Sequence, residues 1–400
     1  MNKNNPETLP KILTLSSLYP NLAQPQHGIF VEHRLRKLLA SRQIRARVLA
    51  PVPWFPFNSK RFGRYAQFSS IPHDEMRHGI EIVHPRFLTL PKIGMSVAPW
   101  LMARSIEHEI TTILESGYHF DIIDAHYFYP DGVAAAILAR KLHIPLVITA
   151  RGTDINLIPK YKLARKAILW AANQAAAIIA VSRALKERMT ELGVDESKIS
   201  VLRNGVDLEF FRPINQMTAR RNVGTWRGRW LLSVGELIER KGHHLIIEAL
   251  SSLKETHLAI IGDGPMHAEL RALAKRLGVA NRVRFLGAVS QDKLRNYYNA
   301  ADALVLASSR EGMANVLLEA IACGLPVVAT PVWGTPEVIA SPDAGLLTSD
   351  RSSDSVLTGI TKLFDNYPDR ERTRNYAERF SWEETTNGLI KMFRSIRNNH

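Results

Sequence analysis

Twice along this chain, short apolar runs rich in β-branched residues alternate with helical patterns, which restricts the fold to a few architectures. The first series of predicted strands spans 11–17, 45–51, 80–85, 120–126, 145–150, 176–182 and 199–204. The second series spans 230–235, 258–264, 282–287, 302–308, 326–330 and 345–349. Helical patterns with an apolar stripe lie between most of them. This order predicts the α/β class, with two open, mostly parallel, doubly wound sheets that each carry helices on both faces.

The chain has 400 residues, which is more than one ordinary hydrophobic core holds, so two domains are expected. Their boundary is predicted within 204–228, which begins with an Asn-Gly turn and then loses its hydrophobic periodicity. We therefore predict an N-terminal domain over 1–205 and a C-terminal domain over 206–380. The last predicted helix, 381–397, is amphipathic and is expected to pack back on the N-terminal domain.

Several classes of protein are disfavoured by composition. No apolar run approaches the roughly 18 residues of a membrane-spanning helix, and the first residues lack the apolar core of a secretory signal. The single cysteine, Cys323, cannot form an internal disulfide, and no Cys/His cluster has the spacing of zinc ligands. We expect a cytoplasmic protein that binds no metal ion.

The net charge of +14 is concentrated in the first half of the chain. Residues 1–205 hold 27 Lys and Arg against 16 Asp and Glu, a balance of +11, which leaves +3 for the rest. No acidic residue occurs between Glu32 and Asp74. This excess suggests an anionic partner, which could be a membrane surface, a lipid diphosphate or nucleic acid, although a basic face exposed to water explains it equally well.

A membrane surface explains the excess charge better than nucleic acid does. A basic helix is expected to begin at 34–37, and aromatic residues alternate with cations farther along the chain. These residues are Trp54, Phe55, Phe57, Lys60, Arg61 and Arg64. Interleaved aromatics and cations are typical of proteins that lie on an anionic bilayer, so we expect peripheral attachment to the inner face of the cytoplasmic membrane. No DNA- or RNA-binding motif accompanies them, so we predict no nucleic-acid partner.

Ligands of open α/β sheets bind beyond the carboxyl ends of the strands, so the chemistry is sought in the loops that follow them. Gly235 begins such a loop, and Arg240 and Lys241 come directly before a helix that is predicted to begin near Gly242. Two cations and the free N–H groups of a helix N-terminus suit a diphosphate. Basic residues are also common in loops that bind nothing.

A second loop, 262–265, contains Gly262 and Gly264 in a tight turn, where missing side chains let a ligand approach the backbone. The loop is not a dinucleotide fingerprint, because that pattern requires a glycine where His267 stands. A dehydrogenase is therefore disfavoured.

The sequence EGMANVLLEAIACG, at 311–324, places Glu311 and Glu319 in otherwise apolar surroundings, where unpaired carboxylates are costly. A helix is predicted from Asn315 to Gly324, so Glu311 precedes it and Glu319 lies about one turn inside it. Negative charge is stabilised at a helix N-terminus. Two acceptor groups there could bind vicinal hydroxyls, one pair on a sugar and another on a ribose.

Four candidates for the acceptor side come from the N-terminal half. His126, Arg151 and Asp154 follow predicted strands and are expected to point into the same gap. Anchoring a loop is an equally good role for each of them. Gly28 opens the first helix, either close to a ligand or simply in a turn.

Taken together, these motifs resemble retaining glycosyltransferases of the GT-B fold, in particular glycosyltransferase family 4. The most specific element is EGMANVLLE, within 311–339, which matches the family's E-x7-E element. The segments VLRNGVD, VGELIERKG and IIGDGP occur in the family's order, and the resemblance covers almost the full length. It implies two Rossmann-like domains facing across a cleft, with the donor bound mainly by the C-terminal one.

The resemblance implies a nucleotide diphospho-sugar as donor substrate and no cofactor. Glu311 is expected to hold hydroxyls of the donor sugar, and Glu319 those of the ribose. Lys241, with Arg240, is expected to neutralise the diphosphate as the sugar leaves. Further donor contacts are assigned to Gly235, Gly262, Gly264, Gly312, Met313 and Ala314.

Two positions depart from the family's pattern. Glu236 stands where the family often has a diphosphate-binding arginine, so Arg240 is the expected substitute. Arg151 stands where a histidine is frequent, and a permanent cation there would favour an acidic sugar or a phosphate. The resemblance is nearest to bacterial enzymes of cell-envelope polysaccharide synthesis, which implies a lipid-linked or glycan acceptor at the membrane.

Retaining transfer requires charge stabilisation at the departing diphosphate and at an oxocarbenium-like sugar. In front-face attack the leaving phosphate takes the acceptor's proton, so no dedicated base is needed. The candidate catalytic residues are Glu311, Lys241, Arg240 and His126. A nucleotide-sugar epimerase or phosphorylase of the same fold, and a non-catalytic nucleotide-sugar sensor, are the alternatives. The nucleotide base, the sugar and the acceptor are not predicted.

Overall fold

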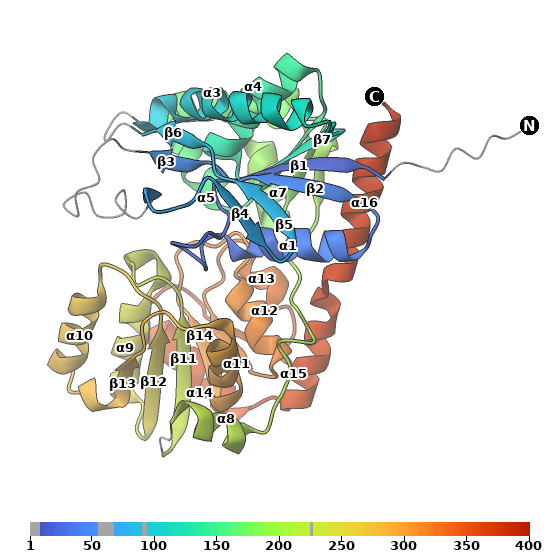
Figure 1. The fold of residues 1–400 in the computed structure, drawn as a ribbon. Helices are drawn as coiled ribbons and strands as arrows, with labels where there is room; N and C mark the ends of the chain where they lie inside the picture. Colours follow the sequence, from blue (N-terminus) through green and yellow to red (C-terminus); the bar gives the residue numbers. More distant parts are fainter. Residues whose placement is uncertain (1–8, 55–67, 90–93, 225–226) are drawn as a thin grey trace, which may run out of the picture. The chain divides into compact units, whose positions relative to one another are not determined.

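The computed structural model describes residues 9–54, 68–89, 94–224 and 227–400 (Figure 1). The chain divides into two compact units. Unit 1 comprises Met1–Asn204 and Glu383–His400, and unit 2 comprises Gly205–Trp382. The boundary predicted after residue 205 lies one residue from this division. The predicted membrane-binding residues from Phe55 to Arg64 lie outside the described part of the chain.

Unit 1 is built on an eight-stranded sheet with the order β10-β9-β8-β7-β1-β2-β5-β4. Its strands are β1 (Lys11–Leu15), β2 (Arg45–Leu49), β4 (Asp74–Arg77), β5 (Ile80–Val83), β7 (Ile122–His126), β8 (Leu146–Ala150), β9 (Ala177–Ala180) and β10 (Ile199–Val201). Only β4 is antiparallel to its neighbour. Two further strands, β3 (Val52–Trp54) and β6 (Arg86–Leu88), form a small parallel sheet. The predicted strands do not include β3, β4 or β6, and β4, which reads DEMR, has no apolar pattern and is held by backbone pairing with β5.

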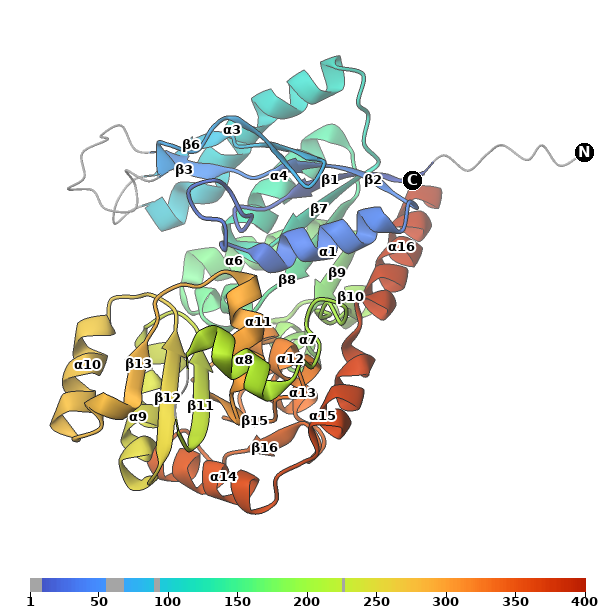
Figure 2. The same cartoon turned by 60° about the horizontal axis from the view of Figure 1, so that its bottom comes forward.

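Helices cover both faces of this sheet, as the α/β prediction requires (Figures 1 and 2). They are α1 (Ile29–Ala40), α3 (Gly94–Glu115), α4 (Val133–Leu142), α5 (Thr153–Asn156), α6 (Lys162–Gln174), α7 (Arg183–Leu192) and α16 (Trp382–Asn398). Leu38 of α1 and Phe393 of α16 share one core cluster with the sheet, whereas α3 packs with α4. The 22-residue α3 has no predicted counterpart; it contains Pro99, a residue type that normally interrupts a helix.

Helix α1 does not present the basic surface expected at 34–37. Leu35 and Leu38 belong to its buried stripe, and Arg34 lies on the same face because residues three and four positions apart are neighbours on a helix. Arg34 is 4% exposed, and its guanidinium donates to Thr149 Oγ1 at 2.8 Å. The prediction that Arg34 contributes to a membrane-facing surface is therefore wrong, whereas Arg36 is exposed.

Unit 2 contains a six-stranded, fully parallel sheet with the order β13-β12-β11-β14-β15-β16. Its strands are β11 (Arg229–Val234), β12 (Thr256–Ile261), β13 (Val283–Phe285), β14 (Ala303–Leu306), β15 (Val327–Ala329) and β16 (Gly345–Leu347). Its helices are α8 (Gln216–Val223), α9 (His243–Ser252), α10 (His267–Arg276), α11 (Gln291–Ala300), α12 (Asn315–Ala322), α13 (Thr335–Val338), α14 (Ser353–Asp365) and α15 (Arg370–Ala377). All six strands predicted for this half are present. One core cluster joins α9, α10 and α14 to the sheet, and α11 packs on α8 and α12 (Figure 2).

Each sheet has a point where the order of its strands reverses. In unit 2 the chain places β12 and β13 on one side of β11 and β14, β15 and β16 on the other, so the switch point lies between β11 and β14. In unit 1 it lies between β1 and β7. Loops that leave neighbouring strands at a switch point run to opposite faces and leave a crevice for a ligand. In neither unit do the described residues include a helix with the length and apolarity needed to cross a bilayer.

Candidate functional site

The loops that follow β11 and β14 lie against each other at the switch point of unit 2. The backbone N–H of Ser309 donates to the carbonyl of Arg240 at 2.8 Å. Gly242, with a φ of 69°, caps α9 so close to the second loop that a Cβ atom there would lie 2.0 Å from the Ala307 carbonyl oxygen. Only glycine fits such a contact. The loop sequence therefore fixes Arg240 and Lys241 beside the segment that carries Glu311.

Three of the predicted residues meet around one carboxylate. Lys241 Nζ lies 2.6 Å from Glu311 Oε1, and Ser308 Oγ donates to the same oxygen at 2.7 Å. Arg240 Nη1 lies 3.5 Å from that oxygen and donates to the Arg310 carbonyl at 3.1 Å. The side chains of Glu311 and Lys241 are 10% and 14% exposed. The group is thus largely shielded from water but still open to a ligand.

Glu311 is ionised in these surroundings. Burial by itself would raise the pKa of its carboxyl, but the charges of Lys241 and Arg240 and the hydrogen bonds from Lys241 and Ser308 bring the pKa below its usual value. Among the described residues these contacts all go to Oε1. The other carboxylate oxygen is available to accept a hydrogen bond from a hydroxyl.

Glu319 lies one turn inside α12 and has a different partner. Tyr298, in α11, donates its hydroxyl to Glu319 Oε2 at 2.7 Å. Burial raises the pKa of Glu319 to about 7, and the bond from Tyr298 opposes this only in part. No hydrogen bond or ion pair within the described chain joins Glu319 to Glu311, Lys241 or Arg240. The four predicted residues thus belong to one unit, but only three of them are in contact.

Helix α12 begins at Asn315, as predicted, and ends at Ala322. Gly312, in the loop before it, is partly exposed, whereas Met313 and Ala314 are 7% and 5% exposed. Because the side chains of Met313 and Ala314 are buried, their predicted contacts with a donor can come only from the backbone. Those contacts stay a prediction.

The glycines after β11 and β12 allow these two loops to pack together. A Cβ atom on Gly262 would lie 2.0 Å from the Gly235 carbonyl oxygen, and one on Gly264 would lie 2.5 Å from the Leu237 carbonyl oxygen. A Cβ atom on Gly235 would lie 3.2 Å from Lys241 Cδ. The space that the missing side chains leave at Gly262 and Gly264 is therefore filled by the neighbouring loop. Backbone contact between these glycines and a donor stays a prediction.

His243, the first residue of α9, contacts the loop that follows β11. Its Nε2 lies 3.3 Å from the Glu236 carbonyl oxygen, and its Nδ1 lies 2.9 Å from Ser233 Oγ. Burial lowers the pKa of His243 to about 4, so the ring is neutral at pH 7. The carboxylate of Glu236 is negatively charged and cannot bind a diphosphate as an arginine would. That Arg240 takes over this role stays a prediction.

Ser308 and Tyr298 were not predicted as site residues. Ser308 is the last residue of a predicted strand and stands three positions before Glu311, so its place at the strand end was a usable signal. Tyr298 stands 21 positions before Glu319, and no periodicity connects the two. Only the packing of α11 against α12 brings them together.

In unit 1, Asp154 holds together the loops that follow β7 and β8. It is buried, and its carboxylate accepts backbone N–H bonds from Phe128 at 2.8 Å, from Gly152 at 2.7 Å and from Arg151 at 3.1 Å. Burial raises the pKa of Asp154 although these bonds oppose the rise. Both carboxylate oxygens are engaged. The sequence left two roles open for Asp154, substrate contact and loop anchoring, and the structure supports loop anchoring.

His126 is buried between an acid and a cation at the end of β7. Its Nε2 lies 3.1 Å from Asp124 Oδ2, and its Nδ1 accepts a hydrogen bond from the Arg151 guanidinium. Burial lowers the pKa of His126 to about 3; Asp124 opposes this shift, and Arg151 and Arg34 add to it. The ring is therefore neutral, with its proton on Nε2. Because both nitrogens are engaged, His126 has no free position for a substrate proton, and its observed role is to orient Arg151.

Gly28 caps α1 in the left-handed region, with a φ of 64°. A Cβ atom there would lie 2.2 Å from the Leu18 carbonyl oxygen. The close contact at Gly28 is therefore with the backbone of the same chain. Of the two roles left open for Gly28, the structure supports the turn.

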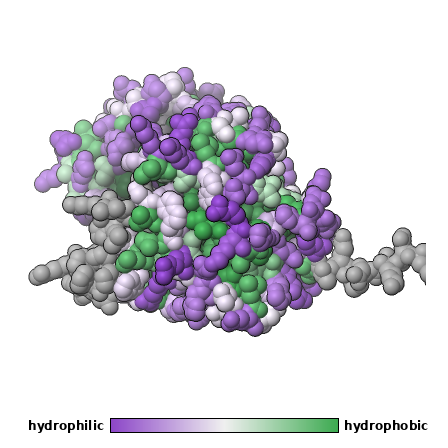
Figure 3. All heavy atoms as spheres, turned by 90° about the horizontal axis from the view of Figure 1, so that it is seen from above, coloured by the Kyte–Doolittle hydropathy of each residue, from purple (hydrophilic) through white to green (hydrophobic). Residues whose placement is uncertain are grey.

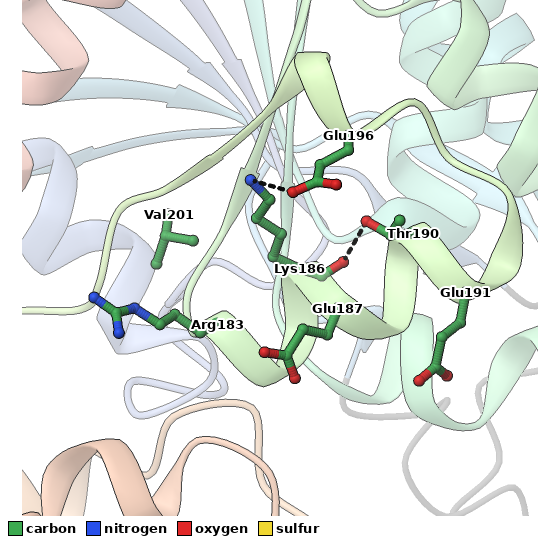
Figure 4. Close-up of a pocket in the computed structure, with 7 residues that line it drawn as sticks. All are labelled: Arg183, Lys186, Glu187, Thr190, Glu191, Glu196 and Val201. Atoms are coloured by element: carbon green, nitrogen blue, oxygen red, sulfur yellow. Dashed lines mark hydrogen bonds and ion pairs between the residues drawn. The ribbon is translucent and has the colours of Figure 1, made fainter.

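Two surface hollows lie apart from all of these residues. The larger, of about 660 Å³ on unit 1, is lined by Arg183, Lys186, Glu187, Thr190, Glu191, Glu196 and Val201 (Figure 4). The smaller, of about 280 Å³ on unit 2, is lined by Arg220, Gly228, Arg229, Asp302, Phe364 and Tyr367. Each contains one ion pair, Lys186 with Glu196 at 3.1 Å and Arg220 with Asp302 at 2.8 Å, and neither includes a predicted site residue. Neither hollow is therefore preferred over the switch point as a donor site.

Comparison with known proteins identifies the family. The model of "Glycosyl transferases group 1" matches residues 223–380, and that of "Glycosyltransferase Family 4" matches residues 30–210. A protein of Bacillus subtilis (strain 168) named for teichuronic acid biosynthesis, the glycosyltransferase TuaC, is 30% identical over 359 residues, which cover 88% of each chain. The chain belongs to glycosyltransferase family 4.

Solved structures show the same fold. Sucrose-phosphate synthase from Thermosynechococcus elongatus superposes with a TM-score of 0.80 at 17% identity, over 98% of this chain and 100% of that one. Anabaena HepE, solved in complex with UDP-glucose, superposes with a TM-score of 0.73 at 23% identity, over 96% and 99%. The predicted GT-B class, with two Rossmann-like units, is confirmed for this glycosyltransferase.

The ionisation of Glu319 gives a test of its burial. A carboxyl whose pKa rises from 4.5 to about 7 on folding stabilises the fold fully below about pH 4.5, and the benefit is lost as pH rises through 7. Glu319→Gln cannot ionise and keeps an oxygen for Tyr298. We expect the free energy of unfolding of this variant, relative to wild type, to increase by roughly 1–3 kcal/mol between about pH 5.5 and about pH 8.5, measured by urea unfolding.

Glu269→Gln is the matched control, because Glu269 is exposed on α10 of the same unit. Its difference from wild type should be independent of pH. A difference for Glu319→Gln that is equally independent of pH would show that Glu319 is not buried as a carboxylic acid.

Proposed function

We propose that this glycosyltransferase moves a sugar from a nucleotide diphospho-sugar to an acceptor with retention of anomeric configuration and without a metal ion. The observation that carries the proposal is the 2.6 Å ion pair between Lys241 and Glu311 at the switch point of unit 2. A cation suited to a diphosphate and an acid suited to sugar hydroxyls are here already in contact, so little reorganisation is needed on binding. The UDP-glucose complex of Anabaena HepE supports this class of donor.

In the proposed reaction, the diphosphate binds where Arg240 and Lys241 precede the N-terminus of α9. Backbone N–H groups point out of this helix end, and Gly242 lets the chain enter it beside the second loop. Negative charge on the diphosphate grows as the glycosidic bond breaks. Two fixed cations stabilise that charge more in the transition state than in the ground state, which lowers the barrier.

The two glutamates are proposed to position the rest of the donor. Glu311 is ionised and accepts hydrogen bonds from hydroxyls of the transferred sugar, so it fixes the sugar next to Lys241. Glu319 is proposed to accept from the ribose hydroxyls with the oxygen that Tyr298 does not use. Loss of Glu311 should therefore affect turnover, and loss of Glu319 should affect nucleotide affinity.

The Glu311→Gln variant tests the proposed reaction. A thermal-shift panel of UDP-, GDP- and ADP-sugars first selects a donor, and its hydrolysis or transfer is then followed by NMR. We expect kcat to fall about 10²–10³-fold, because the neutral amide no longer holds Lys241 or the sugar in place. The affinity for the free nucleoside diphosphate should change less than about threefold by calorimetry.

Glu269→Gln again serves as the matched control and should keep wild-type kcat. If Glu311→Gln binds and turns over the donor like wild type, the site assignment is overturned. Donor binding without turnover by the wild type would favour a non-catalytic sensor. Interconversion of the UDP-sugar without transfer would favour an epimerase.

Retention is proposed because, among the described residues of unit 1, the two predicted candidates for a base are already engaged. Asp154 is engaged by three backbone N–H groups, and His126 uses both ring nitrogens. In front-face attack the departing diphosphate itself accepts the acceptor's proton, so no further base is required. A metal ion is not required either, since Arg240 and Lys241 supply the positive charge.

Product stereochemistry and metal dependence test this mechanism together. With an α-linked nucleotide sugar, the sugar first released by slow hydrolysis should be the α-anomer, seen by proton NMR before mutarotation. Activity should persist in EDTA; among the described residues no cluster of three or more His, Cys, Asp or Glu could hold a metal ion. An initial β-anomer would overturn retention, and loss of activity in EDTA that Mg²⁺ or Mn²⁺ restores would overturn metal independence.

The acceptor is proposed to be a lipid-linked or glycan intermediate of cell-envelope polysaccharide synthesis at the inner face of the cytoplasmic membrane. The name of the relative TuaC supports the pathway class. The charge of +11 over residues 1–205 supports attachment to anionic lipid. On the face of unit 1 that carries α3 and α4, apolar side chains are interspersed with hydrophilic ones (Figure 3). That face alone does not define a membrane-binding patch.

The start of α6 offers a better-defined surface. Six exposed residues there are basic or apolar, and none is acidic: Lys160, Tyr161, Lys162, Leu163, Arg165 and Lys166. The two apolar side chains, Tyr161 and Leu163, are 54% and 68% exposed. Exposed apolar groups surrounded by cations are suited to insertion into an anionic interface.

Vesicle flotation tests the membrane proposal. We expect wild type to float with vesicles that contain an anionic lipid and not with neutral ones, because the attraction is electrostatic. Reversal of three charges to Glu, at Lys162, Arg165 and Lys166 or at Lys60, Arg61 and Arg64, should reduce flotation severalfold for the surface that binds. A control reversal at Arg183, Lys186 and Arg188 should not. The proposal fails if wild type shows no preference for anionic lipid or if neither test variant differs from it.

A further inference from the structure

Arg151 lies directly after β8, at the carboxyl edge of the unit 1 sheet, and its guanidinium makes only neutral contacts. It donates to Asn204 Oδ1 at 2.9 Å and to His126 Nδ1, and its centre lies 4.9 Å from the middle of the Phe30 ring. Within the described chain it forms no ion pair, and its Nε has no hydrogen-bond partner. The residue as a whole keeps partial exposure. A permanent cation is thus held at this edge without a counter-ion of its own.

The neutral state of His126 explains why the guanidinium has this orientation. Asp124 accepts the proton of His126 Nε2, which leaves the lone pair of Nδ1 facing Arg151. A protonated imidazole could not accept a hydrogen bond from a guanidinium. The Asp124–His126 pair therefore positions Arg151 without neutralising it.

A second guanidinium increases the local positive charge. Arg34 is 4% exposed, donates to Thr149 Oγ1 at 2.8 Å and lies 3.7 Å from Asp124 Oδ2. Two acids oppose this charge: Asp124 lies beside Arg34, and Asp154 accepts the backbone N–H of Arg151. Within the described chain neither of them forms an ion pair with the Arg151 guanidinium. Burial lowers the pKa of Arg151 to about 9, and the charge of Arg34 adds to this effect.

Such an arrangement is unfavourable unless an anion completes it. Burying a guanidinium without a paired carboxylate is energetically unfavourable, and its contacts to Asn204 and Phe30 could be made by a neutral side chain. An oxyanion within reach of the Arg151 guanidinium would gain charge-assisted hydrogen bonds and relieve the repulsion between the two arginines. The planar fork of a guanidinium matches either a carboxylate or a phosphate.

We propose that Arg151, supported by the buried Arg34, binds a carboxylate or phosphate group of the acceptor. The substrate class is thereby narrowed to anionic acceptors, either a uronic acid or a phosphorylated sugar. This inference rests on the proposed function, because the acceptor is assigned to unit 1. The neutral His126 serves as a positioning residue for Arg151.

Binding of small acceptors to the full chain in the presence of UDP tests the inference. D-glucuronate, D-glucose 6-phosphate and D-glucose are titrated and followed by saturation-transfer NMR. We expect at least one of the two anions to bind about tenfold or more tightly than glucose, because charge-assisted hydrogen bonds discriminate strongly. The anion that is preferred identifies a carboxylate or a phosphate as the recognised group.

Three variants connect the preference to its residue. Arg151→Gln should abolish the preference for the anion, and Arg151→Lys, which keeps the charge but loses the planar fork, should retain part of it. Arg104→Gln is the control, because Arg104 is exposed on α3 of the same unit. It should bind like wild type. Circular dichroism of each variant verifies that it is folded.

Equal binding of glucose and both anions by wild type would overturn the inference, as would an unchanged preference in Arg151→Gln. Titration of the donor in the same samples distinguishes a failure of this inference from a failure of the proposed function. If the donor binds and turns over while no anion is preferred, only the inference fails. If the anion is preferred and no donor binds, the transferase proposal fails and the anion site remains.

Discussion

The switch-point site of unit 2 depends on one compensated charge, the Glu311 carboxylate in contact with Lys241 and Arg240. Without these cations burial would favour the protonated acid, and a protonated Glu311 would be a poor acceptor for sugar hydroxyls. The contact exists because Gly242 lets the loop after β11 lie against the loop after β14. A single close backbone approach thus sets both the ionisation of the acid and the position of the cations.

Unit 1 has a different arrangement of charges at the carboxyl edge of its sheet. Arg34 lies beside Asp124, whereas the Arg151 guanidinium contacts the neutral imidazole of His126. One unit therefore holds a carboxylate between cations, and the other holds, among its described residues, a guanidinium that forms no ion pair. The first arrangement suits hydroxyl groups and a leaving diphosphate, and the second suits a substrate that carries its own negative charge.

Much of this architecture could be predicted because parallel strands buried on both faces are continuous apolar runs. The start of α12 at Asn315 followed from the change from loop to apolar helix in a single segment. Arg34 could not be placed in the same way. A charged side chain usually lies on the exposed face of a helix. Arg34 stands four positions from the buried Leu38, and only Thr149 and Asp124 on neighbouring strands make its burial tolerable.

The sequence by itself determined most strands of the two large sheets, the loops that follow them and the residue types in those loops, because these depend on local hydrophobic patterning and turn chemistry. The tertiary structure alone decided which of those residues touch. Tyr298 in α11 donates to Glu319 in α12, and Asp154 accepts three backbone N–H groups from two loops. Ionisation followed from these contacts, since a pKa is set by burial and by the charges that packing brings near, and neither is encoded by spacing along the chain.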